Sequence, residues 1–236
     1  MSKDVGVRVS PPAPPYRGDV ASVLSVNVGK ARPIASKGGA SGIDKRPTAD
    51  PVLITAPGPG ASGLAGDAIC DVKNHGGADQ AVYAYASEDL EAWSVELGKA
   101  FGPGAFGENL TTVDLDVTGA RLGEQWQIGD ECVLQVTVPR IPCRTFAVWL
   151  DEQGWVKRFT ARAIPGAYLR VLTPGRVQSG DPITVVHRPD HDVTIGLSFR
   201  ALTAEPQLLP QLLAAGADLT EDVERRARRR EPIGLD

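Results

Sequence analysis

The sequence is poor in cysteine, and the few cysteines present exclude the usual cysteine-based architectures. Its 236 residues include three cysteines, Cys70, Cys132 and Cys143, with no Cys-x-x-Cys pair among them. An odd number at these spacings indicates neither a disulfide framework nor a zinc site. Free thiols persist best in a reducing compartment, and no export signal is evident, so we predict a cytoplasmic protein.

Long apolar runs and an excess of positive charge are also absent. No run approaches the roughly 20 apolar residues that span a bilayer, so we expect no membrane association. The net charge is -4, which gives no reason to expect nucleic acid as a partner. The arginine-rich run at 224–230 is interpreted as a solvated helix end rather than a nucleic-acid arm.

Short strands separated by turn residues are abundant. Alternating or β-branched runs predict strands at 20–28, 52–55, 81–85, 126–128, 132–138, 168–172 and 183–187. One helix is predicted over 88–97, with Ser87 as its N-cap and Gly98 as its stop. Many short strands and few helices favour a mostly-β barrel over a parallel α/β sheet.

The chain divides into three parts by composition. Residues 1–19 are rich in proline and are predicted to form a disordered tail. Residues 20–190 contain the predicted barrel. Residues 191–236 are rich in leucine, alanine, arginine and glutamate, so we expect a small segment of short helices packed outside the barrel.

A cysteine between two arginines stands where a predicted strand ends. Pro139 ends that strand because proline has no N–H for a sheet ladder. Pro142 keeps the preceding residue out of the α region, so the chain stays extended up to Cys143. Arg140 and Arg144 lie on either side, and nearby cations stabilise the thiolate that attacks electrophiles or binds metal. The alternative interpretation is a buried, inert cysteine at a strand end.

Four motifs in this order carry a family resemblance. They are His-Gly-Gly-Ala-Asp-Gln-Ala-Val-Tyr-Ala-Tyr at 75–85, Phe-Gly-Glu-Asn-Leu-Thr-Thr at 106–112, Pro-Arg-Ile-Pro-Cys at 139–143 and Gly-Ala-Tyr-Leu-Arg-Val-Leu-Thr-Pro-Gly-Arg-Val at 166–177. The series resembles the MOSC domain family, most closely its bacterial YiiM-like branch. The resemblance covers about 20–190, is looser in the helical C-terminal segment, and leaves out the proline-rich extension.

This resemblance implies a MOSC-type β-barrel, similar to the pyruvate kinase β-barrel, that binds the molybdenum cofactor. Cys143 matches the residue that ligates molybdenum in the family, and soft thiolate sulfur suits such a metal. The pterin and phosphate of the cofactor need cationic and backbone N–H partners. The candidates for these contacts are Lys30, Lys45, Arg140, Arg144, Gly38, Gly39, Gly76 and Gly77. Each cation alone is more often a solvated surface charge, except Arg140, whose place beside Cys143 is fixed.

Two further polar residues match the family's cleft. His75 precedes two glycines, and imidazole is the natural proton donor near neutral pH. Its alternative role is a hydrogen bond within a turn or the core. Asn109, with Glu108, lies on a glycine-flanked turn, where the pair either shapes a pterin pocket or caps the turn.

The resemblance implies an oxidoreductase that reduces N-hydroxylated compounds, such as nucleobases, at a Cys143-ligated molybdenum. The sequence contains no flavin, nicotinamide or iron–sulfur motif, so the electrons are expected from a separate redox protein. A second hypothesis is a cofactor carrier or sulfur-transfer module in which Cys143 bears a persulfide. A third is an interaction domain without metal. The sequence does not determine the oligomeric state.

Overall fold

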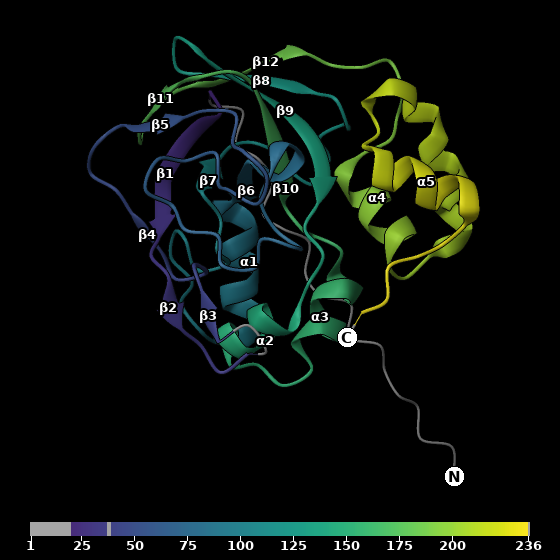
Figure 1. Cartoon of the computed structure of the whole chain (residues 1–236), viewed down its shortest axis with the longest axis horizontal. Coiled ribbons are helices and arrows are strands. Elements are labelled where there is room, and N and C mark those ends of the chain that lie inside the picture. Colours follow the sequence, from purple (N-terminus) through teal and green to yellow (C-terminus); the bar gives the residue numbers. More distant parts are fainter. Residues whose placement is uncertain (1–19, 37–38, 236) are drawn as a thin grey trace.

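The computed structural model of the chain describes residues 20–36 and 39–235 (Figure 1). The predicted tail over 1–19 and the candidate Gly38 lie outside these residues. Helices dominate the described chain after residue 190, and strands provide most of the regular structure before it.

An eight-stranded mixed sheet forms the centre of the fold. Its strands are β1 (Ser22–Gly29), β4 (Lys45–Pro47), β6 (Val82–Ala86), β7 (Leu110–Val113), β8 (Gln125–Ile128), β9 (Cys132–Pro139), β10 (Ala167–Thr173) and β12 (Ile183–His187). The order is β12-β8-β9-β10-β6-β7-β1-β4, and β6 and β7 form its parallel pair. Two small sheets pair β5 (Val52–Ile54) with β11 (Gly175–Val177) and β2 (Arg32–Pro33) with β3 (Ala40–Ser41).

The large sheet curls strongly without forming a complete barrel ladder. Ser22 makes an isolated bridge with Pro182, and the N–H of Ile183 donates to the carbonyl of Ala21 at 2.7 Å. The start of β1 therefore meets the start of β12. The fold is sheet-rich, as predicted, but β4 and β12 remain edges of the sheet rather than joining in a closed barrel.

Each predicted strand is present, with ends shifted by no more than two residues. In β8, partly buried and fully buried positions alternate as expected for a strand with one face on the core. In β6 all five residues are buried, because this strand lies between β7 and β10 in the middle of the sheet.

The helix predicted over 88–97 is α1 (Ser87–Leu97), and its start differs from the prediction. Ser87 is the first helical residue and Ala86 takes the N-cap position without a side-chain hydrogen bond, so the predicted Ser87 cap is wrong by one residue. The end agrees with the prediction, because Gly98 has a φ of 64° in the left-handed region that glycine adopts easily.

The remaining helices form two groups. Near the end of β9 lie η1 (Ala78–Gln80), α2 (Arg144–Leu150) and α3 (Trp155–Arg162), and the C-terminal group consists of α4 (Ile195–Leu202), η2 (Pro206–Asp218) and α5 (Glu221–Arg229). The C-terminal helices share a core with the sheet through Leu202, Leu212 and Val223. No helix of the described residues is long and apolar enough to span a bilayer.

A second, aromatic core lies beneath the end of β9. Its large buried side chains are Tyr85, Trp93, Phe106, Phe146, Trp155, Phe159 and Phe199. They come from β6, α1, α2, α3, α4 and the loop before β7, so this core holds those elements together. Cys143 packs against its margin.

Candidate functional site

The sequence places Cys143 at a corner between a strand and a helix, as predicted. Pro139 is the last residue of β9, and Cys143 has extended backbone angles (φ −130°, ψ 168°). The helix α2 begins at Arg144, the next residue. Cys143 is partly exposed, whereas Cys132 in β9 is fully buried. The corner therefore holds a cysteine that the rest of the protein does not cover completely.

The surroundings of Cys143 favour its thiolate. Burial alone would raise the pKa of the thiol, but hydrogen bonding from His75, the positive charge of Arg140 and the backbone N–H of Phe146 together lower it to about 7. Burial raises the pKa of Cys132 to about 12, with Asp181 adding to the effect. Near neutral pH a large fraction of Cys143 is thus thiolate, the form that reacts and can bind metal, whereas Cys132 stays a protonated core thiol.

The guanidinium of Arg140 is buried, and aromatic rings surround it. The residue is 5% exposed, and its guanidinium carbon lies 3.8 Å from the ring centre of Phe146 and 5.1 Å from that of Tyr83. One terminal nitrogen donates to the carbonyl of Phe106. Nε has no hydrogen-bond partner among the described residues. This geometry gives the corner a fixed positive charge.

Two tyrosines complete the corner, and the sequence analysis did not single them out. Tyr83 on β6 and Tyr168 on β10 face each other in the sheet register, with ring centres 5.0 Å apart. Burial raises the pKa of Tyr168, and the charges of Arg140 and Cys143 both act on it. The alternation of side chains along one strand shows which residues of that strand share a face. It does not show that Tyr83 and Tyr168 are partners, which follows from the register of β6 against β10.

His75 reaches Cys143 from the loop that precedes η1. Gly76 and Gly77 follow it with φ of 81° and 83°, and a Cβ on Gly76 would lie 2.8 Å from the carbonyl oxygen of Ala61. These positions therefore require glycine. The structure thus brings His75 next to Cys143, with Gly76 adjoining His75 in the same loop.

An ion pair fastens η1, and with it the His75 loop, to the sheet. Nε of Arg170 on β10 donates to Oδ1 of Asp79 at 2.9 Å. The hydroxyl oxygen of Thr137 on β9 lies 2.6 Å from the Asp79 carbonyl oxygen and 2.9 Å from that of Tyr168, so its one proton is shared between these two acceptors. These contacts position the histidine relative to the end of β9.

Lys45 and Asn109 belong to a buried polar network. Nζ of Lys45 lies 2.5 Å from Oδ1 of Asp67, whose side chain is fully buried. Asn109 donates to Oδ2 of Asp67 at 3.0 Å and accepts from the N–H of Tyr83 at 3.1 Å. Burial lowers the pKa of Lys45, although Asp67 opposes the change. Both residues therefore bind Asp67, and their contacts hold β4, the Asp67 loop and β6 together.

Glu108 is a turn cap, one of its two expected roles. Its carboxylate accepts hydrogen bonds from the N–H groups of Gly104 and Phe106 at 2.6 and 3.0 Å and from the Thr111 hydroxyl at 2.8 Å. Burial raises its pKa despite these donors. The turn in turn presents the Phe106 carbonyl to Arg140.

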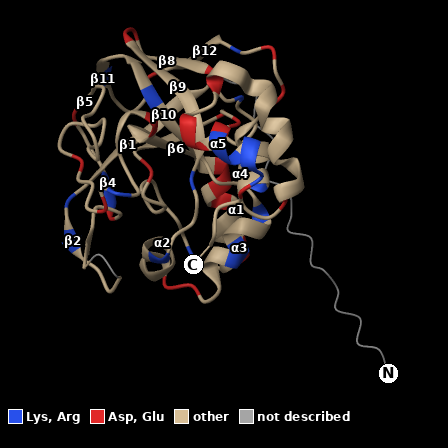
Figure 2. Ribbon diagram, turned by 45° about the vertical axis from the view of Figure 1, so that its right-hand side comes forward, with Lys and Arg blue, Asp and Glu red and all other residues tan. Residues whose placement is uncertain are grey.

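Lys30 and Arg144 are exposed, unlike Arg140 and Lys45. Lys30 follows β1, and Arg144 opens α2 directly after Cys143. The hydroxyl of Thr145 on α2 donates to that of Ser36 at 3.3 Å, which joins α2 to the β2–β3 hairpin. Figure 2 shows basic positions on β2, β4 and α2 along this side of the molecule. Gly39, with a φ of 69°, lies in the same hairpin, and no close contact restricts a Cβ there.

Comparison with known proteins identifies the family. The MOSC domain profile matches residues 71–184. The chain is 33% identical over 181 residues to the uncharacterised protein YflK of Bacillus subtilis, which covers 76% of this chain and 79% of YflK. The chain belongs to the MOSC domain family.

Two further comparisons concern the fold of this MOSC protein and a relative named as a reductase. The crystal structure of YiiM from Geobacillus stearothermophilus superposes with a TM-score of 0.71 at 28% identity and covers 89% of this chain and 99% of that one. A protein named as a reductase from Gibberella moniliformis is 30% identical over 132 residues, which are 55% of this chain and 23% of that longer protein. The fold is therefore YiiM-like.

The matched range of this MOSC protein contains most of its candidate site. It includes His75, Gly76, Asn109, Arg140 and Cys143. Lys30, which directly follows β1, and Lys45, the first residue of β4, precede it.

The corner of this MOSC protein fits a phosphate-bearing cofactor that is ligated by sulfur. Cys143 offers a partly exposed thiolate, and the unpartnered Nε of Arg140 is a buried donor beside it. Gly77, at a φ of 83°, has no side chain, so the backbone of the His75 loop is uncovered at this position. A soft sulfur donor, cations and bare backbone are the groups that such a cofactor requires.

Proposed function

We propose that this MOSC protein is an oxidoreductase that holds the molybdenum cofactor through Cys143 and reduces N-hydroxylated compounds. The observation that carries the proposal is the Cys143 thiol, whose pKa of about 7 and partial exposure make it a ligating thiolate at neutral pH. The family assignment and the relative named as a reductase support oxidoreductase chemistry.

The residues of the corner divide the work of binding. Cys143 would ligate the metal, and Arg140 would keep the sulfur anionic through its fixed charge. Lys30 and Arg144 are exposed cations that would meet the cofactor's phosphate, and Gly76 and Gly77 would let its pterin approach the backbone. Lys45 and Asn109 would support the cleft through Asp67.

The reaction requires two electrons and two protons. An N-hydroxylated group is converted by R–NH–OH + 2 e⁻ + 2 H⁺ → R–NH₂ + H₂O, and the bound cofactor supplies the two-electron, oxygen-accepting chemistry. His75 lies within hydrogen-bonding reach of the Cys143 sulfur, so it would hold a proton beside the oxygen that leaves as water. A separate redox protein would provide the electrons.

The same thiolate also suits a second function. A partly exposed sulfur with a pKa of about 7 can carry a persulfide, as in a cofactor carrier or sulfur-transfer module. Turnover of an N-hydroxylated substrate distinguishes the reductase from the carrier. Metal content distinguishes both from an interaction domain without metal.

The decisive experiment measures metal, pterin and turnover in one preparation. The protein is made in a host that is competent for cofactor synthesis, and molybdenum is measured by elemental analysis and the pterin by fluorescence. Reduction of an N-hydroxylated nucleobase is then followed with a chemical electron donor. We expect molybdenum and pterin to co-purify with the wild type and to be lost in Cys143→Ser. Cofactor without turnover would favour the carrier, and absence of both from the wild type would reject the two molybdenum functions.

A further inference from the structure

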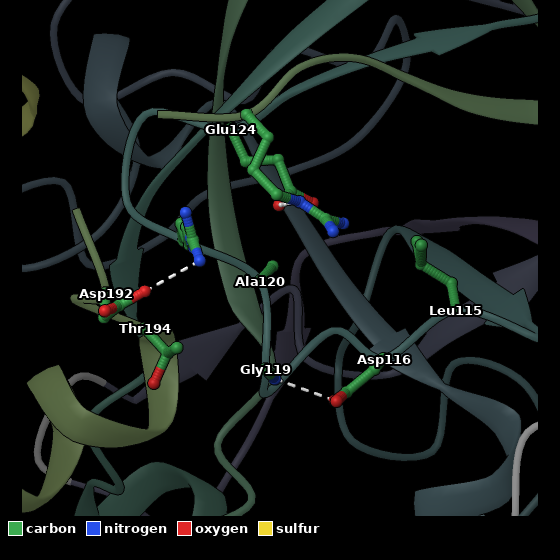
Figure 3. A pocket seen from close by; sticks show the side chains of 9 residues that line it. Leu115, Asp116, Gly119, Ala120, Glu124, Asp192 and Thr194 are labelled. Carbon is green, nitrogen blue, oxygen red and sulfur yellow. Dashed lines mark hydrogen bonds and ion pairs between the residues drawn. The ribbon is translucent and has the colours of Figure 1, made fainter. Parts of the chain in front are cut away.

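A cavity lies away from the Cys143 corner. Its volume is about 390 Å³, and it is lined by parts of the chain between β7 and β8, between β12 and α4, and at the start of α4. Figure 3 shows Leu115, Asp116, Glu124, Asp192 and Thr194 arranged around it. None of its lining residues belongs to the site described above. A volume of this size is within the roughly 300–1,000 Å³ of small-molecule pockets.

One wall of the cavity holds a preoriented arginine. Glu124 is 2% exposed, and its two carboxylate oxygens accept from Nε1 of Trp126 and from Nε of Arg188, each at 2.8 Å. The carboxylate thus fixes Arg188 through Nε. In the part of the chain that the structure describes, the two terminal nitrogens of Arg188 have no protein partner. A guanidinium held in this way presents its parallel N–H pair to an oxyanion.

A second arginine and a helix N-terminus line the same cavity. Arg121 is fixed by hydrogen bonds from Nη1 to the Pro189 carbonyl and from Nη2 to Oδ1 of Asp192, each at 2.7 Å. Thr194 is the N-cap of the eight-residue helix α4, so the positive end of that helix dipole points to this region. The first N–H groups of α4 are already bonded to the Thr118 and Ala120 carbonyls, so only the dipole's field contributes.

The lining holds three carboxylates, and two of them are paired with its two arginines. Glu124 is paired with Arg188, and Asp192 is 91% exposed, so water and salt screen its charge. Oδ1 of Asp116 accepts the N–H of Gly119 at 2.7 Å. Leu115 and Ala120, both buried, form an apolar part of the lining. A ligand that matches this lining has an oxyanion at one end and a small apolar body.

We propose that this cavity binds a small organic oxyanion, a carboxylate or a phosphate ester, through the terminal nitrogens of Arg188. The site lies where the sheet meets the C-terminal helices, and it is independent of the function proposed for Cys143.

The test is calorimetric titration with inorganic phosphate and with succinate at constant ionic strength. The proteins are the wild type, Arg188→Gln, Arg188→Lys and, as a matched control, Arg176→Gln, which changes an exposed arginine on β11. We expect saturable binding of at least one probe, at least tenfold weaker in Arg188→Gln, intermediate in Arg188→Lys and unchanged in Arg176→Gln.

The preferred probe assigns the chemistry of the anion. Tighter binding of phosphate indicates a phosphate ester, and tighter binding of succinate indicates a carboxylate. The proposal is overturned if neither probe saturates, or if Arg188→Gln binds both probes as the wild type does. Arg188 has an exposed side chain, so its variants are expected to fold, and matching melting temperatures verify this.

Discussion

Arg140 is stacked on Phe146, with its guanidinium carbon 3.8 Å from the centre of the ring. The backbone N–H of the same phenylalanine acts on the sulfur of Cys143. One residue of α2 therefore fixes the cation through its ring and supports the thiolate through its backbone. Because the cation is caged, its effect on the sulfur does not depend on a ligand.

Replacing Cys143 by serine should separate chemistry from folding. We expect Cys143→Ser to lose cofactor retention and reductase turnover while it keeps the wild-type melting temperature, because the thiol is at the edge of the aromatic core. Metal analysis, turnover and circular dichroism measure these properties.

Cys132→Ser is the matched comparison. Cys132 is completely buried in β9, and a hydroxyl placed there without a partner costs about 1–3 kcal/mol of unfolding free energy. It should therefore lose stability and keep turnover at matched loading. If Cys143→Ser and the wild type show equal turnover at matched molybdenum content, Cys143 is not required for the reaction.

The hydrogen bond from His75 and the charge of Arg140 should together set the pH dependence of thiol reactivity in the apo protein. In a Cys70→Ser background, alkylation of Cys143 by iodoacetamide should rise with pH around a midpoint of about 7, because the thiolate reacts. Arg140→Met should raise that midpoint by about one unit, and Arg140→Lys should largely preserve it because the charge stays.

The lysine variant also tests how Arg140 would act toward a cofactor. If Arg140 holds the phosphate or pterin by two parallel hydrogen bonds, Arg140→Lys should weaken binding about ten- to a hundredfold, as expected for a lost charge-assisted bond. If it acts only through its charge on Cys143, binding should change little. An unshifted alkylation profile in folded Arg140→Met contradicts the electrostatic role.

The sequence predicted the elements that local pattern specifies and missed those that depend on pairing. β-branched alternation gave β1 and β9, and the two prolines gave the extended corner before Cys143. The partnership of Tyr83 and Tyr168 depends on the register of β6 against β10, which local pattern does not encode. In the same way, burial of Arg140 follows from the rings of Tyr83 and Phe146, which β6 and α2 bring to it.

The η2 segment illustrates a related limit. The sequence indicates breaks between short helices at Pro206, Pro210 and Gly216. Pro206 begins η2 and Gly216 interrupts it, but Pro210 lies inside this 3₁₀ helix, so the break predicted there is wrong. Pro210 has no N–H, and Gly216 has a non-helical conformation, so regular α-helical bonding is interrupted. The η2 segment packs against α4 and α5, and local sequence does not specify this packing.

Asp89 should make the protein less stable as the pH rises. The residue is 2% exposed, its Oδ2 has no hydrogen-bond partner among the described residues, and burial, with Asp116 and Glu88, raises its pKa to about 7. An unfolded aspartate titrates near 3.9, so the folded state holds the extra proton between about pH 4 and 7. Stability from this group is complete below about pH 4 and is lost as the pH rises through 7.

Asp89→Asn should therefore be more stable than the wild type at pH 8, by on the order of 1–3 kcal/mol, and the advantage should shrink toward pH 4. Urea unfolding at several pH values measures it. Glu91→Gln, an exposed change on the same helix, is the control and should show no such trend. If the difference in unfolding free energy between Asp89→Asn and the wild type does not change with pH, Asp89 does not titrate as proposed.

Deleting residues from 197 onward should prevent stable folding. The deletion removes Leu202, Leu209, Leu212 and Val223, which are buried in the core shared with the sheet. Each buried aliphatic side chain contributes about 1.5–3 kcal/mol, so losing four approaches or exceeds the roughly 5–15 kcal/mol by which domains are stable. The uncovered sheet face should also promote aggregation, which light scattering and analytical ultracentrifugation detect. Removing only residues 234–236, beyond the last helix, is the control and should leave a monodisperse, stable protein. A truncated chain that stays monodisperse and melts with the wild type would show that the sheet folds without its C-terminal helices.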